Sequence, residues 1–251
     1  MITIQGKGVY GAVAIGHISF FRRGEVRVRR ERITDTQKEF DRFHKARTAA
    51  IAQLNALYEK ALPEIGEPNA QIFDIHRMML EDADFSDSVM NIIEKQHMNA
   101  EYAVAVTADN FALLFSSMED SYMKERAADV KDVANRVLTC FSEDAQPAAA
   151  TGDGLIICAD DLAPSETVQL DKSRVLAFVT KSGSLNSHTA ILARTMNIPA
   201  VIGAGDALTE SLEGKPAIVD GFTGIVYIDP DEKTMRRMRE KQAEDQKNKA
   251  L

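Results

Sequence analysis

The sequence is poor in the residues that mark several common protein classes. Its 251 residues include two cysteines, Cys140 and Cys158, and their spacing forms no disulfide framework. We therefore expect reduced thiols and a cytoplasmic location. No apolar run approaches the length of a membrane span, and residues 1–4 do not resemble a signal peptide. The sequence thus predicts no membrane insertion.

Basic residues are outnumbered by acidic ones, which gives a formal net charge of −8. This charge argues against general binding to nucleic acid and favours a partner that carries a basic patch. The apolar content of 45% and the charged content of 27% are typical of a globular chain. The length is sufficient for two domains, each with its own core.

Glycine and proline are almost absent between about residues 30 and 141, where apolar residues recur at helical spacing. Residues 8–21 and 150–228 instead show short β-like runs separated by glycine, proline and aspartate. Because the first strands need a sheet, we expect them to join the later ones. The predicted fold is an α/β domain of residues 1–22 and 145–229, with an all-α helical bundle (30–143) inserted into it. A charged helix (230–251) follows.

Helix boundaries in the middle block can be placed from capping and breaking residues. Thr36 and Glu39 form a candidate capping box at the first helix. Further boundaries are expected at Gly66 with Pro68, at residues 82–84, at Asn99 and at Ser121. Strands are expected at residues 155–158, 175–179, 200–202, 217–219 and 225–228.

His188 is the main candidate for chemistry. It follows the strand-like run 175–179 and a loop of small residues that includes Gly183, and a helix-like run starts at Thr189. A helix N-terminus favours a phosphoryl group, because its backbone N–H groups lack intrahelical partners and the dipole end is positive. Ser187 and Thr189 can cap the helix or bind an anion. A lone histidine is usually structural, but this setting favours a residue that itself carries phosphate.

Two segments resemble motifs of the Enzyme I family of the bacterial phosphoenolpyruvate:sugar phosphotransferase system. Residues 181–194 are similar to its phosphohistidine motif, roughly Gly-Gly-x-Thr-Ser-His-x-x-Ile-x-Ala-Arg. The matching residues are Gly183, Ser187, His188, Ile191, Ala193 and Arg194, and the departures are Ser184 and Asn186. Residues 159–167 resemble its Asp-Leu-x-Pro-Ser-Glu-Thr turn.

The resemblance implies a role for each motif residue. His188 is the nucleophile and carries the phosphoryl group on Nε2, which makes it a tele-phosphohistidine. Thr167 hydrogen-bonds the unphosphorylated ring, and Ser187, Thr189 and Arg194 support the site. With an ordinary imidazole pKa of ~6.5, no strong general base is required.

The helical block carries two further similarities, at residues 72–82 and 124–130. In the Enzyme I family this insertion binds HPr, a small histidine phosphocarrier. The implied contact positions are Asn69, Met78, Met79, Asp82, Asp84 and Arg126. The segment is acidic, and from charge alone a solvated helix face is the simpler interpretation. Met78, Met79 and Phe85 among the carboxylates also suit a docking surface. His76 falls on an apolar stripe, which predicts a structural role.

By resemblance, phosphoenolpyruvate and Mg²⁺ bind a separate C-terminal domain that also forms the homodimer and is not in this sequence. The chain is therefore expected to be a monomer without a cofactor that exchanges phosphate with HPr but cannot phosphorylate itself. Its last helix would be the linker to that domain. A kinase glycine loop is lacking, so ATP is not the expected donor. Two alternatives stay open: a swivelling domain of a pyruvate dikinase or synthase, and a helical binding module with an incidental histidine.

Overall fold

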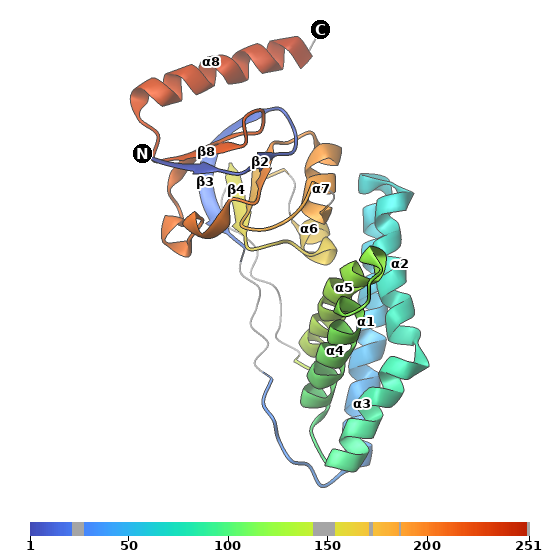
Figure 1. Cartoon of the computed structure of the whole chain (residues 1–251). Coiled ribbons are helices and arrows are strands. Elements are labelled where there is room, and N and C mark those ends of the chain that lie inside the picture. Colours follow the sequence, from blue (N-terminus) through green and yellow to red (C-terminus); the bar gives the residue numbers. More distant parts are fainter. Residues whose placement is uncertain (22–27, 143–153, 171–172, 186, 250–251) are drawn as a thin grey trace. The chain divides into compact units, whose positions relative to one another are not determined.

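The computed structural model describes residues 1–21, 28–142, 154–170, 173–185 and 187–249. The chain is mixed α/β and divides into two compact units. The αβ unit comprises Met1–Arg23 with Ala148–Leu251 and contains the sheet, and the helical unit is Gly24–Pro147 (Figure 1). The helical unit thus lies, along the chain, between two segments of the αβ unit.

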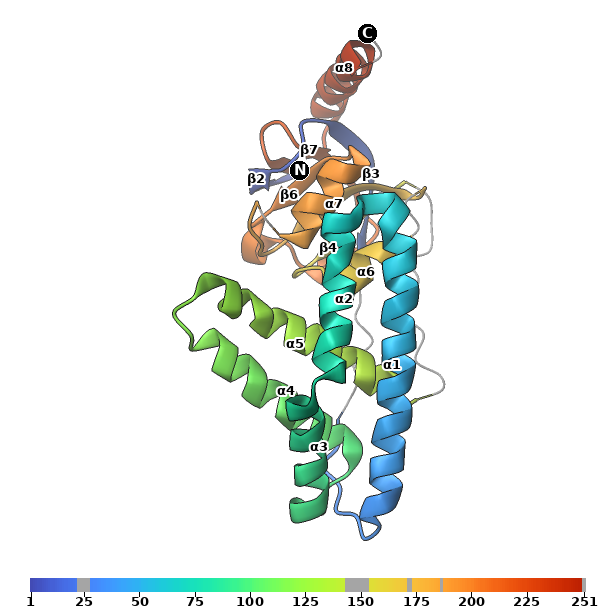
Figure 2. The ribbon, with the colours of Figure 1, turned by 90° about the vertical axis from the view of Figure 1, so that its right-hand side faces the viewer.

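The helical unit is formed by five consecutive helices. They are α1 (Thr36–Ile65), α2 (Glu67–Glu81), α3 (Ala83–Gln96), α4 (Ala100–Ser116) and α5 (Ser121–Thr139). α1 packs along α2, and α4 packs along α5 (Figure 2). α1 ends at Gly66, whose φ of 77° favours glycine, and α2 ends at Asp82. Both of these boundaries were expected from the sequence.

The start of α1 differs from the expected capping box. Its N-cap is Asp35, whose carboxylate accepts a hydrogen bond from the Lys38 N–H at 3.0 Å, and Thr36 is already the first helical residue. Glu39 is buried and accepts from the Ala100 N–H at 2.7 Å, at the start of α4. Glu39 therefore ties two helices together and does not cap its own.

The predicted starts of α4 and α5 agree with the structure to within one residue. Asn99 occupies the N-cap position of α4, but its side chain accepts from the Glu31 N–H at 2.9 Å and makes no cap bond. The N-cap of α5 is Asp120, one residue before the expected Ser121, and its carboxylate accepts from the Tyr122 N–H at 2.8 Å.

The described residues of the αβ unit form one eight-stranded sheet. Its strands are β1 (Ile2–Gln5), β2 (Lys7–Gly8), β3 (Val13–Phe20), β4 (Leu155–Ala159), β5 (Val175–Thr180), β6 (Ala200–Ile202), β7 (Pro216–Asp220) and β8 (Ile225–Ile228). The order is β1-β8-β7-β3-β4-β5-β6-β2. β3 through β6 are parallel neighbours, and β3 lies between β7 and β4, so the N-terminal strands join the later sheet as expected.

Gly6 allows the first residues to connect the two ends of the sheet. β1 pairs with β8 at one end of the strand order, and β2 pairs with β6 at the other. Gly6 is the single residue between β1 and β2, so it connects the two edges. The Gly6 N–H donates to the Gly224 carbonyl oxygen at 2.8 Å. A Cβ on Gly6 would lie 2.6 Å from the Ile202 carbonyl oxygen, closer than real Cβ atoms approach. A side chain is therefore excluded at this position.

The final helix, α8 (Glu232–Lys249), packs on the αβ unit through its first half. Met238 is buried with Val13 and Ile218. Lys241 Nζ lies 2.7 Å from a carboxylate oxygen of the buried Asp220. This stretch of α8 therefore belongs to the αβ unit and covers one face of its sheet.

Both cysteines are free thiols, Cys140 in the helical unit and Cys158 in β4. Burial raises the pKa of the Cys158 thiol well above its ordinary value. Among the helices that the structure describes, none is both long and apolar enough to cross a membrane.

Candidate functional site

The two sequence motifs meet at one edge of the sheet. β4 and β5 are adjacent and parallel, so their carboxyl ends lie at the same edge. α6 (Pro164–Gln169) follows β4, and α7 (His188–Met196) follows β5. α6 and α7 pack against each other. The carboxyl edge of a parallel sheet is where α/β proteins commonly bind ligands.

His188 is the first residue of α7, and its side chain is exposed. The preceding residue, Ser187, is the N-cap, and its hydroxyl accepts from the Ala190 N–H at 3.3 Å. This confirms the expected change from strand to helix N-terminus at His188. The imidazole is thus at the positive end of a helix, close to backbone N–H groups that an anion can use.

The start of the loop before His188 is fastened to the end of β4. Lys181 N–H donates to the Ala159 carbonyl oxygen at 3.0 Å, and Ser182 donates to the Asp160 carbonyl oxygen from both its N–H and its hydroxyl. Lys181 Nζ lies 2.9 Å from Asp160 Oδ1, and this hydrogen bond raises the pKa of Lys181. These contacts were not expected from the sequence, although Asp160 and Lys181 each lie two residues after the end of a predicted strand.

Arg194 fastens the other end of the same loop. Its Nη1 donates to the Leu185 carbonyl oxygen at 2.9 Å, although Leu185 lies nine residues earlier in the chain, before α7 begins. Gly183 has a φ of 116°, which side-chain-bearing residues rarely adopt. Asn186, one of the departures from the family motif, lies outside the described residues.

The two threonines of the site are both buried. The Thr167 hydroxyl donates to the Pro164 carbonyl oxygen at 2.7 Å, which leaves its oxygen able to accept a hydrogen bond. Thr189 is fully buried, and its hydroxyl has no hydrogen-bond partner among the described residues. The Thr189 side chain therefore packs inward, and its support of an anion at the start of α7 stays a prediction.

Among the described residues, no group of three or more histidine, cysteine or carboxylate side chains could hold a metal ion.

The expected partner contacts lie on α2, on the start of α3 and on α5. Met78 is 58% exposed, Met79 is half-buried, and Asp82 and Asp84 are exposed. Asp82 also has a structural task as the N-cap of α3, accepting from the Asp84 N–H at 2.7 Å. The Asn69 amide donates to the Ile65 carbonyl oxygen at 2.8 Å, so part of this side chain is used at the end of α1.

Phe85 does not belong to an exposed surface, contrary to the sequence interpretation. It is buried, and its ring packs edge-to-face with Phe111 at a centroid distance of 5.8 Å. Exposed apolar side chains occur instead near the junction of α4 and α5. Leu113 is 70% exposed and Leu114 is 54% exposed.

Arg126 of α5 is held by two neighbours. Its Nη1 lies 2.7 Å from Asp129 Oδ2, and its guanidinium carbon lies 4.3 Å from the centroid of the Tyr122 ring. Tyr122 is exposed, so the stacked pair connects a charged group to the surface. We define the expected docking surface, called the docking surface below, as four of the expected contact positions, Met78, Asp82, Asp84 and Arg126, together with Tyr122, which stacks on Arg126.

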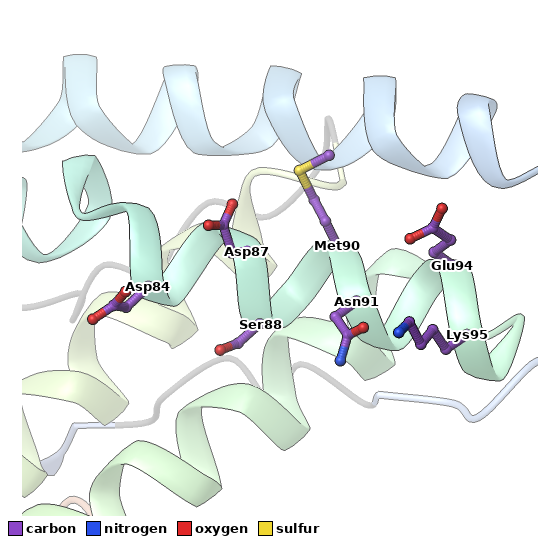
Figure 3. A pocket seen from close by; sticks show the side chains of 7 residues that line it. All are labelled: Asp84, Asp87, Ser88, Met90, Asn91, Glu94 and Lys95. Carbon is purple, nitrogen blue, oxygen red and sulfur yellow. The ribbon is translucent and has the colours of Figure 1, made fainter.

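An open pocket lies along α3. It is lined by Asp84, Asp87, Ser88, Met90, Asn91, Glu94 and Lys95 (Figure 3). All seven come from one helix, and three are acidic. An acidic helix face of this kind needs no ligand to explain it, because its charges are solvated.

Comparison with known proteins covers both units. Residues 5–126 match the model described as PEP-utilising enzyme, N-terminal, and residues 151–224 match PEP-utilising enzyme, mobile domain. A solution structure of an Enzyme I protein superposes with a TM-score of 0.79 and 33% identity, and the match covers 97% of this chain and 99% of that one. The chain belongs to the Enzyme I family.

Two proteins that are longer than this chain also match its sequence. The phosphoenolpyruvate-protein phosphotransferase of Priestia megaterium is 35% identical over 98% of this chain, and that of Bacillus subtilis is 36% identical over 96%. The chain spans 43% and 42% of these two relatives. Because the matches extend over both units, they favour Enzyme I over a dikinase fragment and over a binding module with an incidental histidine.

Proposed function

We propose that this chain is the N-terminal phosphotransfer half of an Enzyme I, which acts in the first step of sugar uptake by group translocation. It exchanges a phosphoryl group between His188 and the histidine of HPr. The observation that carries the proposal is the exposed His188 at the capped N-terminus of α7, in a chain of this family.

The transfer is a nucleophilic displacement at phosphorus. The Nε2 lone pair of neutral His188 attacks the phosphorus of phosphorylated HPr, and a new N–P bond forms. The N–P bond of the donor breaks, and its electron pair stays on the HPr imidazole. The N-terminal amides of α7 stabilise charge on the phosphoryl oxygens, and the fastened loop holds the ring in place. Thr167 positions the ring by accepting its other N–H.

The remaining parts of the reaction belong to partners. Phosphoenolpyruvate supplies the phosphate through the further domain of the longer relatives, which would also bind Mg²⁺ and form the dimer. α8 serves as the linker to that domain. The phosphotransfer takes place in the cytoplasm. His188 must meet both HPr and the phosphoenolpyruvate site, so the αβ unit moves as a rigid swivelling body between them.

The wild-type chain offers a direct test of this function. Incubation with phosphorylated HPr should phosphorylate it, and a phosphate-affinity gel should show the shifted band. Incubation with phosphoenolpyruvate and Mg²⁺ alone should give no shift. A chain that stays unshifted in phosphorylated HPr would refute the proposal.

Arg194→Ala should slow the transfer without abolishing it. The substitution removes the Nη1 contact to the Leu185 carbonyl, so the loop before His188 samples more conformations and the ring is aligned less often. We expect the rate constant for transfer from phosphorylated HPr to fall roughly tenfold, measured by rapid quench. Arg239→Ala, on an exposed position of α8, is the matched control and should keep the wild-type rate. Equal rates in both variants would show that the contact has no positioning role.

Neutralising two carboxylates of the docking surface should weaken HPr binding. The variant Asp82→Asn/Asp84→Asn keeps a side chain that can cap α3 while it removes two charges facing a basic partner. We expect the Kd to rise by about threefold to tenfold at low salt, and the difference to shrink at 0.5 M salt. Isothermal titration calorimetry measures both.

The control for this pair is Glu240→Gln/Glu244→Gln on α8, which changes the net charge equally at exposed positions of the other unit. Its Kd should match that of the wild type. If both double variants lose affinity to the same extent, the effect is one of overall charge, and the docking surface is wrongly placed.

A further inference from the structure

Thr180, the last residue of β5, is a polar residue to which the proposed mechanism assigns no role. It is fully buried, and its hydroxyl donates a hydrogen bond to the Ser182 carbonyl oxygen at 2.6 Å, two residues further along the chain. Valine has nearly the same shape as threonine and avoids the cost of burying a hydroxyl. Packing alone therefore does not account for a threonine at this position.

The hydrogen bond from Thr180 lies where the chain leaves the sheet. The Thr180 carbonyl oxygen accepts from the Ala204 N–H at 2.9 Å, which holds the end of the strand. Ser182 is fastened to the neighbouring strand, because its N–H and its hydroxyl both donate to the Asp160 carbonyl oxygen, at 3.1 and 2.9 Å. The Ser182 carbonyl belongs to the planar peptide unit that joins Ser182 to Gly183. The Thr180 hydroxyl therefore sets the orientation in which Gly183 begins the loop.

Gly183 connects this hydrogen bond to the start of α7. A Cβ on Gly183 would lie 3.5 Å from Thr180 Oγ1 and 3.6 Å from Ser187 Oγ, so the glycine lies beside both hydroxyls. Ser187 is the N-cap of α7 and directly precedes His188. The Thr180 hydroxyl, Gly183 and the Ser187 cap are thus successive neighbours in space, and the last of them adjoins His188 in the chain.

We propose that Thr180 is a positioning residue for His188: its hydroxyl fixes the peptide unit before Gly183, and through Gly183 it sets the place of the Ser187 cap from which the His188 side chain projects. Without the hydroxyl this peptide unit can rotate, and the imidazole reaches the in-line geometry for phosphoryl transfer less often. The inference rests on the proposed function for its reaction, but the state of the Thr180 hydroxyl can be measured without HPr.

The first experiment observes the Thr180 hydroxyl proton in the wild-type chain by NMR. A buried, hydrogen-bonded hydroxyl exchanges slowly with water and gives its own resonance, whereas an exposed hydroxyl exchanges too fast to be seen. We expect a resolved Thr180 hydroxyl resonance with nuclear Overhauser effects to the α protons of Gly183. Thr195, whose exposed hydroxyl donates to the Ile191 carbonyl oxygen at 3.0 Å, should give none. Fast exchange at Thr180 would overturn the proposal, whatever HPr does.

The second experiment compares Thr180→Val with Thr180→Ser. Each should lower the Tm of the αβ unit by about 3–5 °C, because valine loses the hydrogen bond and serine loses a buried methyl group. The transfer rate constant at saturating phosphorylated HPr, measured by rapid quench, should separate them. We expect it to fall about tenfold in Thr180→Val and to stay within about twofold of wild type in Thr180→Ser. The control Thr195→Val, which makes the same replacement on α7, should keep the wild-type rate.

The outcomes separate positioning from a purely structural role. A structural role would make the rate follow the Tm, so equal rates in Thr180→Val and Thr180→Ser would refute positioning. The Kd for HPr should stay at the wild-type value in both, since the docking surface belongs to the helical unit, and a raised Kd would also count against the proposal. If Thr180→Val does not fold, Thr180→Ala takes its place in the comparison, and a rate equal to that of Thr180→Ser would again overturn the proposal. If wild type itself takes no phosphate from HPr, the proposed function fails while the hydroxyl measurement still stands.

Discussion

The His188→Ala variant is expected to take up no phosphate from phosphorylated HPr under conditions in which the wild-type chain becomes fully labelled. Alanine has no lone pair for phosphorus, and among the described residues of the α7 N-terminus the imidazole is the one nitrogen nucleophile. Loss of a covalent nucleophile typically lowers the rate by at least ~10³-fold. A phosphate-affinity gel with a time course measures the effect.

The matched control is His17→Ala, because His17 is exposed and lies on β3 of the same unit. Its labelling should equal that of the wild type. The His188→Ala variant should still bind HPr with unchanged Kd, since the docking surface is built by the helical unit. Label that persists in His188→Ala would place the nucleophile elsewhere in the chain.

Much of the fold was predictable because each segment has a local pattern that agrees with its final environment. The five predicted strands of residues 155–228 are found within a residue or two of their expected ends. The helix ends at Gly66 and Asp82 follow from backbone preferences that act locally. Asp35 and Thr36 can both cap a helix, and the prediction of Thr36 was wrong because the Asp35 carboxylate makes the cap bond. Glu39 is used by α4, a contact that only the tertiary fold creates.

The site was predictable only where its residues are close in sequence. His188, Ser187 and the helix that they start are signalled within one short segment. The contact between Lys181 and Asp160 depends on the adjacency of β4 and β5, which residue spacing does not reveal. The buried His76 likewise has its carboxylate neighbours, Asp129 and Asp132, on α5, about fifty residues later in the chain. The apolar character of its own helix stripe therefore suggested packing alone.

Exposure on α4 and α3 was not predicted, for a different physical reason. α4 is apolar on nearly all sides, so its sequence shows no contrast between a buried and an exposed face. The exposure of Leu113 and Leu114 could therefore not be predicted from the pattern. Phe85 was assigned to the surface because acidic residues surround it, yet it shares helical spacing with the buried Val89 and Ile92. Periodicity is the better guide there, because burial of one helix face does not depend on the charges of the other face.

Phe178→Ala should produce the largest loss of stability in the αβ unit. The ring is fully buried in β5, where Phe178 pairs with Ile157 of β4 and Ala200 of β6. Truncation removes a large apolar group and leaves a cavity in the sheet that carries the His188 loop. We expect the free energy of unfolding of the αβ unit to fall by about 3–5 kcal/mol. Differential scanning calorimetry should show a lower transition temperature for that unit.

Phe73→Ala is the reciprocal variant, since Phe73 is also fully buried but belongs to α2 of the helical unit. Two compact units with separate cores should unfold in two transitions. Each substitution should then lower one transition and leave the other within about 2 °C, because core contacts in one unit do not depend on ring volume in the other. HPr binding at a temperature below both transitions should survive Phe178→Ala better than Phe73→Ala. A single transition that both variants shift equally would show that the units share one cooperative core.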